Sequence, residues 1–189
     1  MKATQLNCSA SKSVKRGAQN RSNALLAKER LRKRYLPPGV RILFVGESPP
    51  ASGRFFYQAD SGLYRAIREA FVELFPDLKQ SNFLESFRDL GCYLLDLCPM
   101  PVDRLGRKER QKAWSRGEAS LSRVLRRLQP RIVVIVVRSI TENVKRSMQR
   151  ADWRGFQLEL AYPGRWHRHR AAFVRELVPL LRETYNREA

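Results

Sequence analysis

Residue types suited to chemistry on a nucleic acid lie together in the segment GESPPASGRFFY, residues 46–57. A glutamate that directly follows a buried strand and is fixed by two prolines can act as a positioned general base, and Glu47 has this placement. The aromatic residues that end the segment offer a flat surface on which a nucleobase can stack. The alternative is a stiff surface loop whose aromatic side chains pack on the core.

A second candidate segment is YPGRWHRHR, residues 162–170, which is rich in arginine, histidine and tryptophan. Arginines in such a loop can bind phosphates, and Trp166 can fill the space that an extruded nucleobase leaves. His167 or His169 can stabilise negative charge that develops on a leaving group. The alternative is a basic loop that caps the last helix and leaves its histidines exposed. We expect the DNA-contacting residues to be Arg54, Arg165, Trp166, Arg168, His169 and Arg170.

Asp96 is the third candidate, because it stands near the end of the apolar run CYLLDL at residues 92–97. An ionised aspartate accepts hydrogen bonds and can therefore recognise an exocyclic amino group of a nucleobase. An aspartate at the end of a strand can equally cap a turn. We assign a structural role to Asp103, and we assign the basic residues of 107–129 to a solvated helix face.

Alternating apolar runs and amphipathic segments predict an α/β fold that carries these residues. Strands are predicted at residues 41–46, 92–97, 132–137 and 156–162. Helices are predicted at residues 61–75, 82–90 and 107–129, after Ser139 and at 169–185. Gly117 is a candidate interruption of the helix at 107–129, and Pro179 is expected to kink the helix at 169–185. Strands separated by helices pair in parallel, which predicts a three-layer α/β/α domain with a central, mostly parallel sheet of about four strands. Ligands bind at the carboxyl ends of such strands, so we expect the candidate segments to meet there.

The composition favours a polyanionic partner. The chain has 189 residues, with 37 lysines and arginines against 18 aspartates and glutamates, and a formal net charge of +19. We expect a basic, flexible N-terminal arm at residues 1–36 and one folded domain at residues 37–189. Because the sequence has neither an apolar run long enough to span a membrane nor an apolar signal segment, we expect a cytoplasmic protein, nucleoid-associated if it is bacterial.

The cysteines and histidines do not have the spacing of a disulfide framework or a metal site. Cys92 and Cys98 are six residues apart in the sequence. In an extended strand this separation is about 20 Å, at roughly 3.3 Å per residue, which is too far for a disulfide. With no CxxC pair and no cysteine or acidic residue close to the two histidines in the sequence, we expect no metal and no cofactor.

Most of residues 41–175 resembles the uracil-DNA glycosylase superfamily in the order and type of its elements. The residues GESPP at 46–50 look like the first motif of that family, and the resemblance places Glu47 where the family positions the water that attacks the sugar. Phe56 stands where the family has its base-stacking phenylalanine.

The later motifs also resemble the family, with two departures. The segment LLD at 94–96 is similar to the one that ends in a base-recognising asparagine, but here Asp96 takes that place. The segment YPGRW is similar to the late motif, with Trp166 at the position that inserts into the duplex and Tyr162 in place of a histidine that stabilises the departing base. An ionised Asp96 cannot donate a hydrogen bond to a uracil carbonyl, whereas an Asp96 protonated by burial can.

The resemblance implies a DNA N-glycosidase that excises an everted uracil, or another deaminated or damaged nucleobase, by attack of water at the anomeric carbon. The implied catalytic residues are Glu47, Tyr162 and His167, and the implied nucleobase-binding residues are Ser48, Pro49, Phe56 and Asp96. The iron–sulfur subgroup of the superfamily uses four cysteines, and since this chain has three we expect no cluster. The alternatives are an inactive nucleic-acid-binding protein on the same fold and, with less support, a hydrolase of free nucleosides or nucleotides. We expect a monomer with DNA, or RNA, as its partner and no membrane partner.

Overall fold

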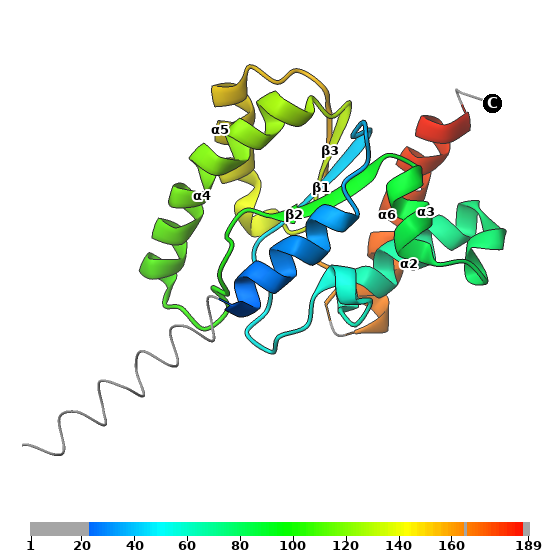
Figure 1. Cartoon of the computed structure of the whole chain (residues 1–189), viewed down its shortest axis with the longest axis horizontal. Coiled ribbons are helices and arrows are strands. Elements are labelled where there is room, and N and C mark those ends of the chain that lie inside the picture. The colour runs from blue at the N-terminus through cyan, green and yellow to red at the C-terminus, as the bar shows by residue number, and fades with distance from the viewer. Residues whose placement is uncertain (1–22, 165, 187–189) are drawn as a thin grey trace, which may run out of the picture. The chain divides into compact units, whose positions relative to one another are not determined.

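The computed structural model describes residues 23–164 and 166–186 (Figure 1). The chain divides into two compact units, Met1–Arg34 and Tyr35–Ala189. In the first unit, residues 23–34 form a helix in which Glu29 pairs with Arg32 and Lys33. Residues 1–22, which make up most of the expected arm, lie outside the described residues.

The second unit is built on a four-stranded parallel sheet with the strand order β2-β1-β3-β4. The strands are β1 (Ile42–Gly46), β2 (Cys92–Asp96), β3 (Ile132–Ile135) and β4 (Phe156–Glu159). Nearly all residues of β1, β2 and β3 are buried, as continuous apolar runs in a parallel sheet require. The predicted α/β class and parallel sheet are confirmed. The last strand was predicted too long, because β4 ends at Glu159.

Helices cover both faces of the sheet (Figure 1). α4 and α5 pack together on one face, and α2, α3 and α6 lie on the other. The α-helices are α2 (Gly62–Leu74), α3 (Phe83–Asp89), α4 (Arg107–Leu128), α5 (Thr141–Ala151) and α6 (His167–Asn186), and the short 3₁₀ helices are η1 (Phe56–Gln58), η2 (Pro76–Lys79) and η3 (Arg138–Ile140). This is the expected three-layer arrangement.

The interruption considered at Gly117 is wrong, because α4 is continuous from Arg107 to Leu128. A Cβ atom at Gly117 would lie 2.3 Å from the carbonyl oxygen of Leu97, just beyond the end of β2. The glycine therefore allows α4 to approach the sheet closely at the edge where the candidate segments were expected to meet.

Aromatic side chains fill the layer between the sheet and the helices α2 and α3. The ring of Phe87 lies 5.5 Å from that of Phe44 on β1 and 5.8 Å from that of Phe71 on α2. Phe56 of η1 joins this cluster, with its ring centroid 5.3 Å from that of Phe87. Because aromatic pairs at these separations attract one another and bury a large apolar area, the core fixes the position of η1.

A buried carboxylate joins α4 to α5. Glu118 is 2% exposed, accepts a hydrogen bond from Asn143 at 2.7 Å, and pairs with Arg146 at 2.8 Å and Arg150 at 3.2 Å. Burial raises the pKa of Glu118, but the hydrogen bonds from Arg146 and Asn143 and the two positive charges outweigh burial and lower the pKa overall. The fold therefore stabilises the ionised form of Glu118.

We expect Glu118→Gln to lower the free energy of unfolding at neutral pH by about 1–3 kcal/mol. This loss is smaller than that from breaking a fully buried ion pair, because the side chains of Arg146 and Arg150 are 46% and 54% exposed. The folded-state pKa of Glu118 is lowered, so the contribution is full above the unfolded-state pKa and disappears as the pH falls through the folded-state pKa. Urea unfolding at several pH values measures this, and the two proteins should converge in stability in acid.

The matched control is Glu142→Gln, which removes a 75% exposed carboxylate that lies 3.9 Å from Lys145 on the same helix. We expect it to change stability by less than about 0.5 kcal/mol. A Glu118→Gln variant as stable as this control at neutral pH would contradict the role given to Glu118.

Candidate active site

A cavity of about 390 Å³ opens at the carboxyl ends of β1 and β2. Of the residues assigned to the site from the sequence, its wall contains Glu47, Ser48, Pro49, Arg54, Phe56, Asp96 and Tyr162. The segments that follow β1, end β2 and follow β4 therefore meet at one edge of the sheet. The volume lies within the range of about 300–1,000 Å³ that is typical of small-molecule sites.

The other assigned residues lie beside this cavity or outside the described part of the chain. A neighbouring hollow of about 410 Å³ shares Arg54 and Tyr162 with the cavity, and its wall also contains Trp166, His167 and Arg170. Arg168 and His169 are exposed in the first turn of α6 and are not among the described residues that line the two hollows. Arg165 lies outside the described residues.

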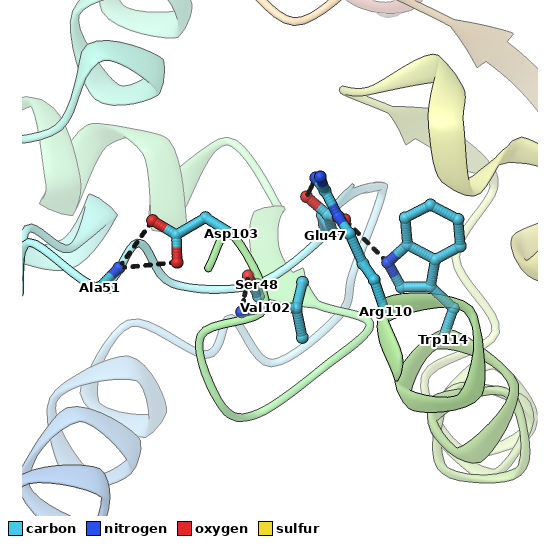
Figure 2. A network of polar contacts seen from close by, with 7 residues as sticks. All are labelled: Glu47, Ser48, Ala51, Val102, Asp103, Arg110 and Trp114. Carbon is cyan, nitrogen blue, oxygen red and sulfur yellow. Dashed lines mark hydrogen bonds and ion pairs between the residues drawn. The ribbon is translucent and has the colours of Figure 1, made fainter. Parts of the chain in front are cut away.

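Glu47 is held by two side chains of α4 that the sequence analysis did not assign to the site (Figure 2). The guanidinium of Arg110 donates to both carboxylate oxygens, from Nε to Oε1 and from Nη2 to Oε2, each at 2.5 Å. Trp114 donates from Nε1 to Oε1 at 2.7 Å. A carboxylate offers about four acceptor positions. Oε1 accepts two of these bonds and Oε2 one, so Oε2 retains acceptor capacity that a water molecule can use.

The close packing of α4 explains how these two residues reach Glu47. Arg110, Trp114 and Gly117 follow one another at helical spacing and share the face of α4 that meets the strand ends. The assignment of the basic residues of this helix to a solvated face is therefore wrong for Arg110. The sequence did contain a signal for this contact, because Gly117, which permits close packing, is on the same helix face as Trp114 and Arg110.

Two contacts tie the loop after β1 to the loop after β2 (Figure 2). The backbone N–H of Ala51 donates to both carboxylate oxygens of Asp103 at 3.2 Å, and the backbone N–H of Val102 donates to the hydroxyl of Ser48 at 3.3 Å. Asp103 therefore has the structural role expected of it, although it also borders the cavity. These bonds hold both sides of the cavity in one arrangement.

Asp96 lies over the end of β1 because the residue beside it has no side chain. Gly46 and Asp96 are partners in the parallel register, and a Cβ atom at Gly46 would lie 2.4 Å from Oδ1 of Asp96. A larger residue at position 46 would displace this carboxylate. The pair thus places an acceptor group in the wall of the cavity.

Tyr162 presents a hydroxyl group to the same cavity. The residue is 49% exposed, yet burial of part of the side chain raises its pKa, and the negative charge of Asp96 raises it further against a smaller opposing effect of Arg65. The hydroxyl is therefore protonated at neutral pH and can donate a hydrogen bond.

Phe56 borders the cavity while most of its ring is packed in the core. It is 3% exposed and meets the ring of Tyr64 edge-on at 5.8 Å and that of Tyr57 edge-on at 5.1 Å. The hydroxyl of Tyr57 donates to the carbonyl of Leu94 at 2.9 Å, which attaches η1 to β2. The ring is therefore fixed before any ligand binds.

Burial makes both described thiols unreactive, that of Cys98 just after β2 and that of Cys92 at the opposite end of β2 from the cavity. Burial is the largest effect on Cys98 and raises its pKa to about 11, with further increases from Glu47 and Asp96. Burial likewise raises the pKa of Cys92 to about 12. Among the described residues, no group of three or more histidine, cysteine, aspartate or glutamate side chains could hold a metal ion. None of the described helices is long and apolar enough to cross a membrane.

We expect Asp96→Asn to lower the pKa of Tyr162, because the variant removes a negative charge that disfavours the phenolate. NMR titration of the protein with isotopically labelled tyrosine measures this. The control is Asp103→Asn, which removes a carboxylate from the same cavity that is not among the charges acting on Tyr162. Equal pKa values of Tyr162 in the wild type and in Asp96→Asn would show that the two groups are not juxtaposed.

The comparison with protein families adds an independent observation to this geometry. The family model described as Uracil DNA glycosylase superfamily matches residues 33–182, which include all four strands and the entire cavity wall. The comparison with curated proteins gives no match. Members of the superfamily are typically DNA glycosylases. The match extends over most of the chain, and the protein therefore belongs to the uracil DNA glycosylase superfamily.

Proposed function

We propose that this protein is a DNA N-glycosidase that hydrolyses the bond between a damaged or deaminated nucleobase and its deoxyribose. The observation that carries the proposal is the meeting of the Glu47 carboxylate, the Phe56 ring and the Asp96 carboxylate in the wall of one cavity of about 390 Å³. An acid, an aromatic surface and a hydrogen-bonding group are the parts that excision of an everted nucleobase requires.

The nucleotide must leave the base stack before it can enter this cavity, which costs a few kcal/mol. Stacking of a nucleobase on an exposed aromatic side chain contributes about 1–3 kcal/mol, and Phe56, which borders the cavity but is only 3% exposed, would supply part of this. Trp166 is 63% exposed beside the cavity and is available to fill the space left in the duplex. Together these contacts would offset the cost of eversion.

In the chemical step, water adds to the anomeric carbon as the bond from this carbon to the base nitrogen breaks. The electron pair of that bond leaves with the nucleobase, and the proton released by the water finally neutralises it. Positive charge develops on the sugar, and the fixed carboxylate of Glu47 would stabilise it. Arg110 and Trp114 hold that carboxylate and leave capacity on Oε2 to orient the water, so Glu47 acts as an electrostatic and orienting group.

The departing nucleobase carries negative charge that a hydrogen-bond donor can stabilise. Tyr162 borders the cavity and has a hydroxyl that stays protonated at neutral pH, so it takes this role in our proposal. His167 lines the neighbouring hollow and can assist from there. Arg54 borders both hollows, which suits a contact with the phosphate next to the everted nucleotide.

Asp96 suggests which kind of nucleobase is bound. An ionised carboxylate accepts hydrogen bonds, so it favours a nucleobase that presents an exocyclic amino group. Uracil presents carbonyl oxygens to which an ionised Asp96 cannot donate, although its ring N–H can still donate to the carboxylate.

The second candidate is a DNA-binding protein without catalytic activity on the same fold. The observation that favours it is the complete engagement of Oε1 of Glu47 by Arg110 and Trp114, which limits Glu47 as a proton acceptor. A hydrolase of free nucleosides is a weaker candidate, because it would have no use for a net charge of +19.

We expect the wild type to release a nucleobase from at least one member of a panel of labelled duplexes that contain uracil, hypoxanthine, xanthine or mismatches. Glu47→Gln should slow this release by about 100-fold or more, because the charge that stabilises the transition state is lost, while DNA binding remains. Alkaline cleavage of the resulting abasic sites measures the release. The control is Glu73→Gln, an exposed position on α2. Tight binding without release from any duplex would support the second candidate.

Uracil, hypoxanthine and xanthine all lack an exocyclic amino group, whereas a mismatched adenine, guanine or cytosine carries one. We expect wild type to prefer such a mismatched nucleobase over uracil, and Asp96→Asn to shift the ratio of their kcat/KM values toward uracil by about 10-fold or more. One well-placed hydrogen-bonding pair discriminates by about 1–3 kcal/mol, which corresponds to this factor. Competition between two labelled substrates in one reaction measures the ratio directly. An unchanged ratio in Asp96→Asn would remove Asp96 from nucleobase recognition.

A further inference from the structure

A basic groove leads away from the cavity across α2 and α6. The hollow of about 410 Å³ beside the cavity shares Arg65 and Arg170 with a larger hollow of about 770 Å³. The larger hollow extends along α2 to Lys79 at the end of η2. Because the smaller hollow also shares Arg54 and Tyr162 with the cavity, the three adjoin one another along the surface.

The charges in this groove are strongly biased to one sign. Cationic side chains recur along its length, namely those of Arg54, Arg65, Arg68, Lys79 and Arg170. Among the described residues that line the two hollows, Glu69 is the only acid, and it is paired with Arg170 at 3.0 Å. Such a groove attracts an extended anion and disfavours an apolar or cationic segment.

The cations are also held in position. Arg68 donates from Nη2 to the carbonyl oxygen of Lys79 at 2.8 Å, which connects α2 to η2, and Arg65 donates from Nη1 to the carbonyl oxygen of Asp60 at 3.4 Å. Each guanidinium carries further N–H groups that can bind oxygen atoms of a phosphate. Part of the entropic cost of ordering these long side chains is therefore met before a ligand arrives.

Aromatic side chains near the cavity and cationic side chains farther along the groove suit the nucleobases and the phosphates of a nucleic-acid strand. The exposed aromatic side chains of Tyr162 and Trp166 lie at the end nearest the cavity, where a displaced nucleobase leaves its neighbours unstacked. The larger hollow is lined by Arg68, Lys79 and Ser81, which can contact a backbone. Its one ring, that of Tyr64, packs edge-on against Phe56 and Phe83.

We propose that the groove formed by Arg65, Arg68, Lys79 and Arg170 binds the phosphodiester backbone of the DNA strand that carries the everted nucleotide, on one side of that nucleotide. The assignment of DNA rests on the proposed function. The groove adds phosphate contacts well beyond the segment at residues 162–170, so the protein depends on DNA that extends past the damaged nucleotide in that direction.

The test is the salt dependence of binding to undamaged DNA by Arg68→Ala/Lys79→Ala, measured by fluorescence anisotropy with duplex and single-stranded probes. We expect the slope of log K against log salt to fall by about 1.8 for duplex and about 1.4 for single strands, the values for two lost phosphate contacts. The matched control is Arg123→Ala/Arg127→Ala, which removes the same charge from exposed positions on α4. Its slope should stay at the wild-type value. Equal slopes in both double variants would overturn the proposal.

A second measurement locates the contact along the strand. Duplexes with a central abasic-site analogue are shortened stepwise from either end, and we expect wild type to lose affinity at a longer length on one side than on the other. The Arg68→Ala/Lys79→Ala variant should lose this asymmetry. Because neither measurement requires release of a nucleobase, a protein without glycosidase activity would still show both effects, and the two proposals can fail separately. Symmetric length dependence in wild type would overturn the groove assignment.

Discussion

The absence of a side chain at residue 46 is the constraint on which the site depends. Oδ1 of Asp96 lies 2.4 Å from the point where a Cβ atom of residue 46 would stand. With glycine there, β1 and β2 end level with one another, and the carboxylate of Asp96 can lie over the end of β1. The loops that leave these strand ends then form opposite walls of one cavity, which the bonds from Ala51 to Asp103 and from Val102 to Ser48 keep in place.

A second close approach, of α4 to the end of β2, makes the position of Glu47 depend on helix packing that also stabilises the fold. Gly117 brings α4 against Leu97, and one turn or two before it α4 carries Trp114 and Arg110 to Glu47. The buried Glu118, the residue after Gly117, attaches α4 to α5. The position of the Glu47 carboxylate is thus fixed by the packing of a whole helix, which is the preorganisation that electrostatic stabilisation of a transition state requires.

The sequence was sufficient for the sheet and for most of the cavity wall, for different reasons. Buried parallel strands are continuous apolar runs, so IVVI at 132–135 was recognisable without context, and the rule that ligands bind beyond the strand ends placed Glu47 and Asp96 together. Arg110 taken alone was not recognisable, since a basic residue on a helix has the same appearance in the sequence whether it meets water or a distant carboxylate. The only signal was the spacing that places it on one helix face with Trp114 and Gly117. The path of the groove across α2 and α6 was equally inaccessible, because it depends on how two helices far apart in the chain pack.

The most direct test of the account is a crystal structure of the Glu47→Gln protein bound to a duplex that contains the nucleobase released by wild type. The account predicts that this nucleobase lies inside the cavity, with its ring against Phe56 and its polar edge at Asp96, and that the anomeric carbon faces residue 47. A nucleobase still stacked in the duplex, or DNA bound on another face while the cavity stays closed by its own side chains, would contradict it.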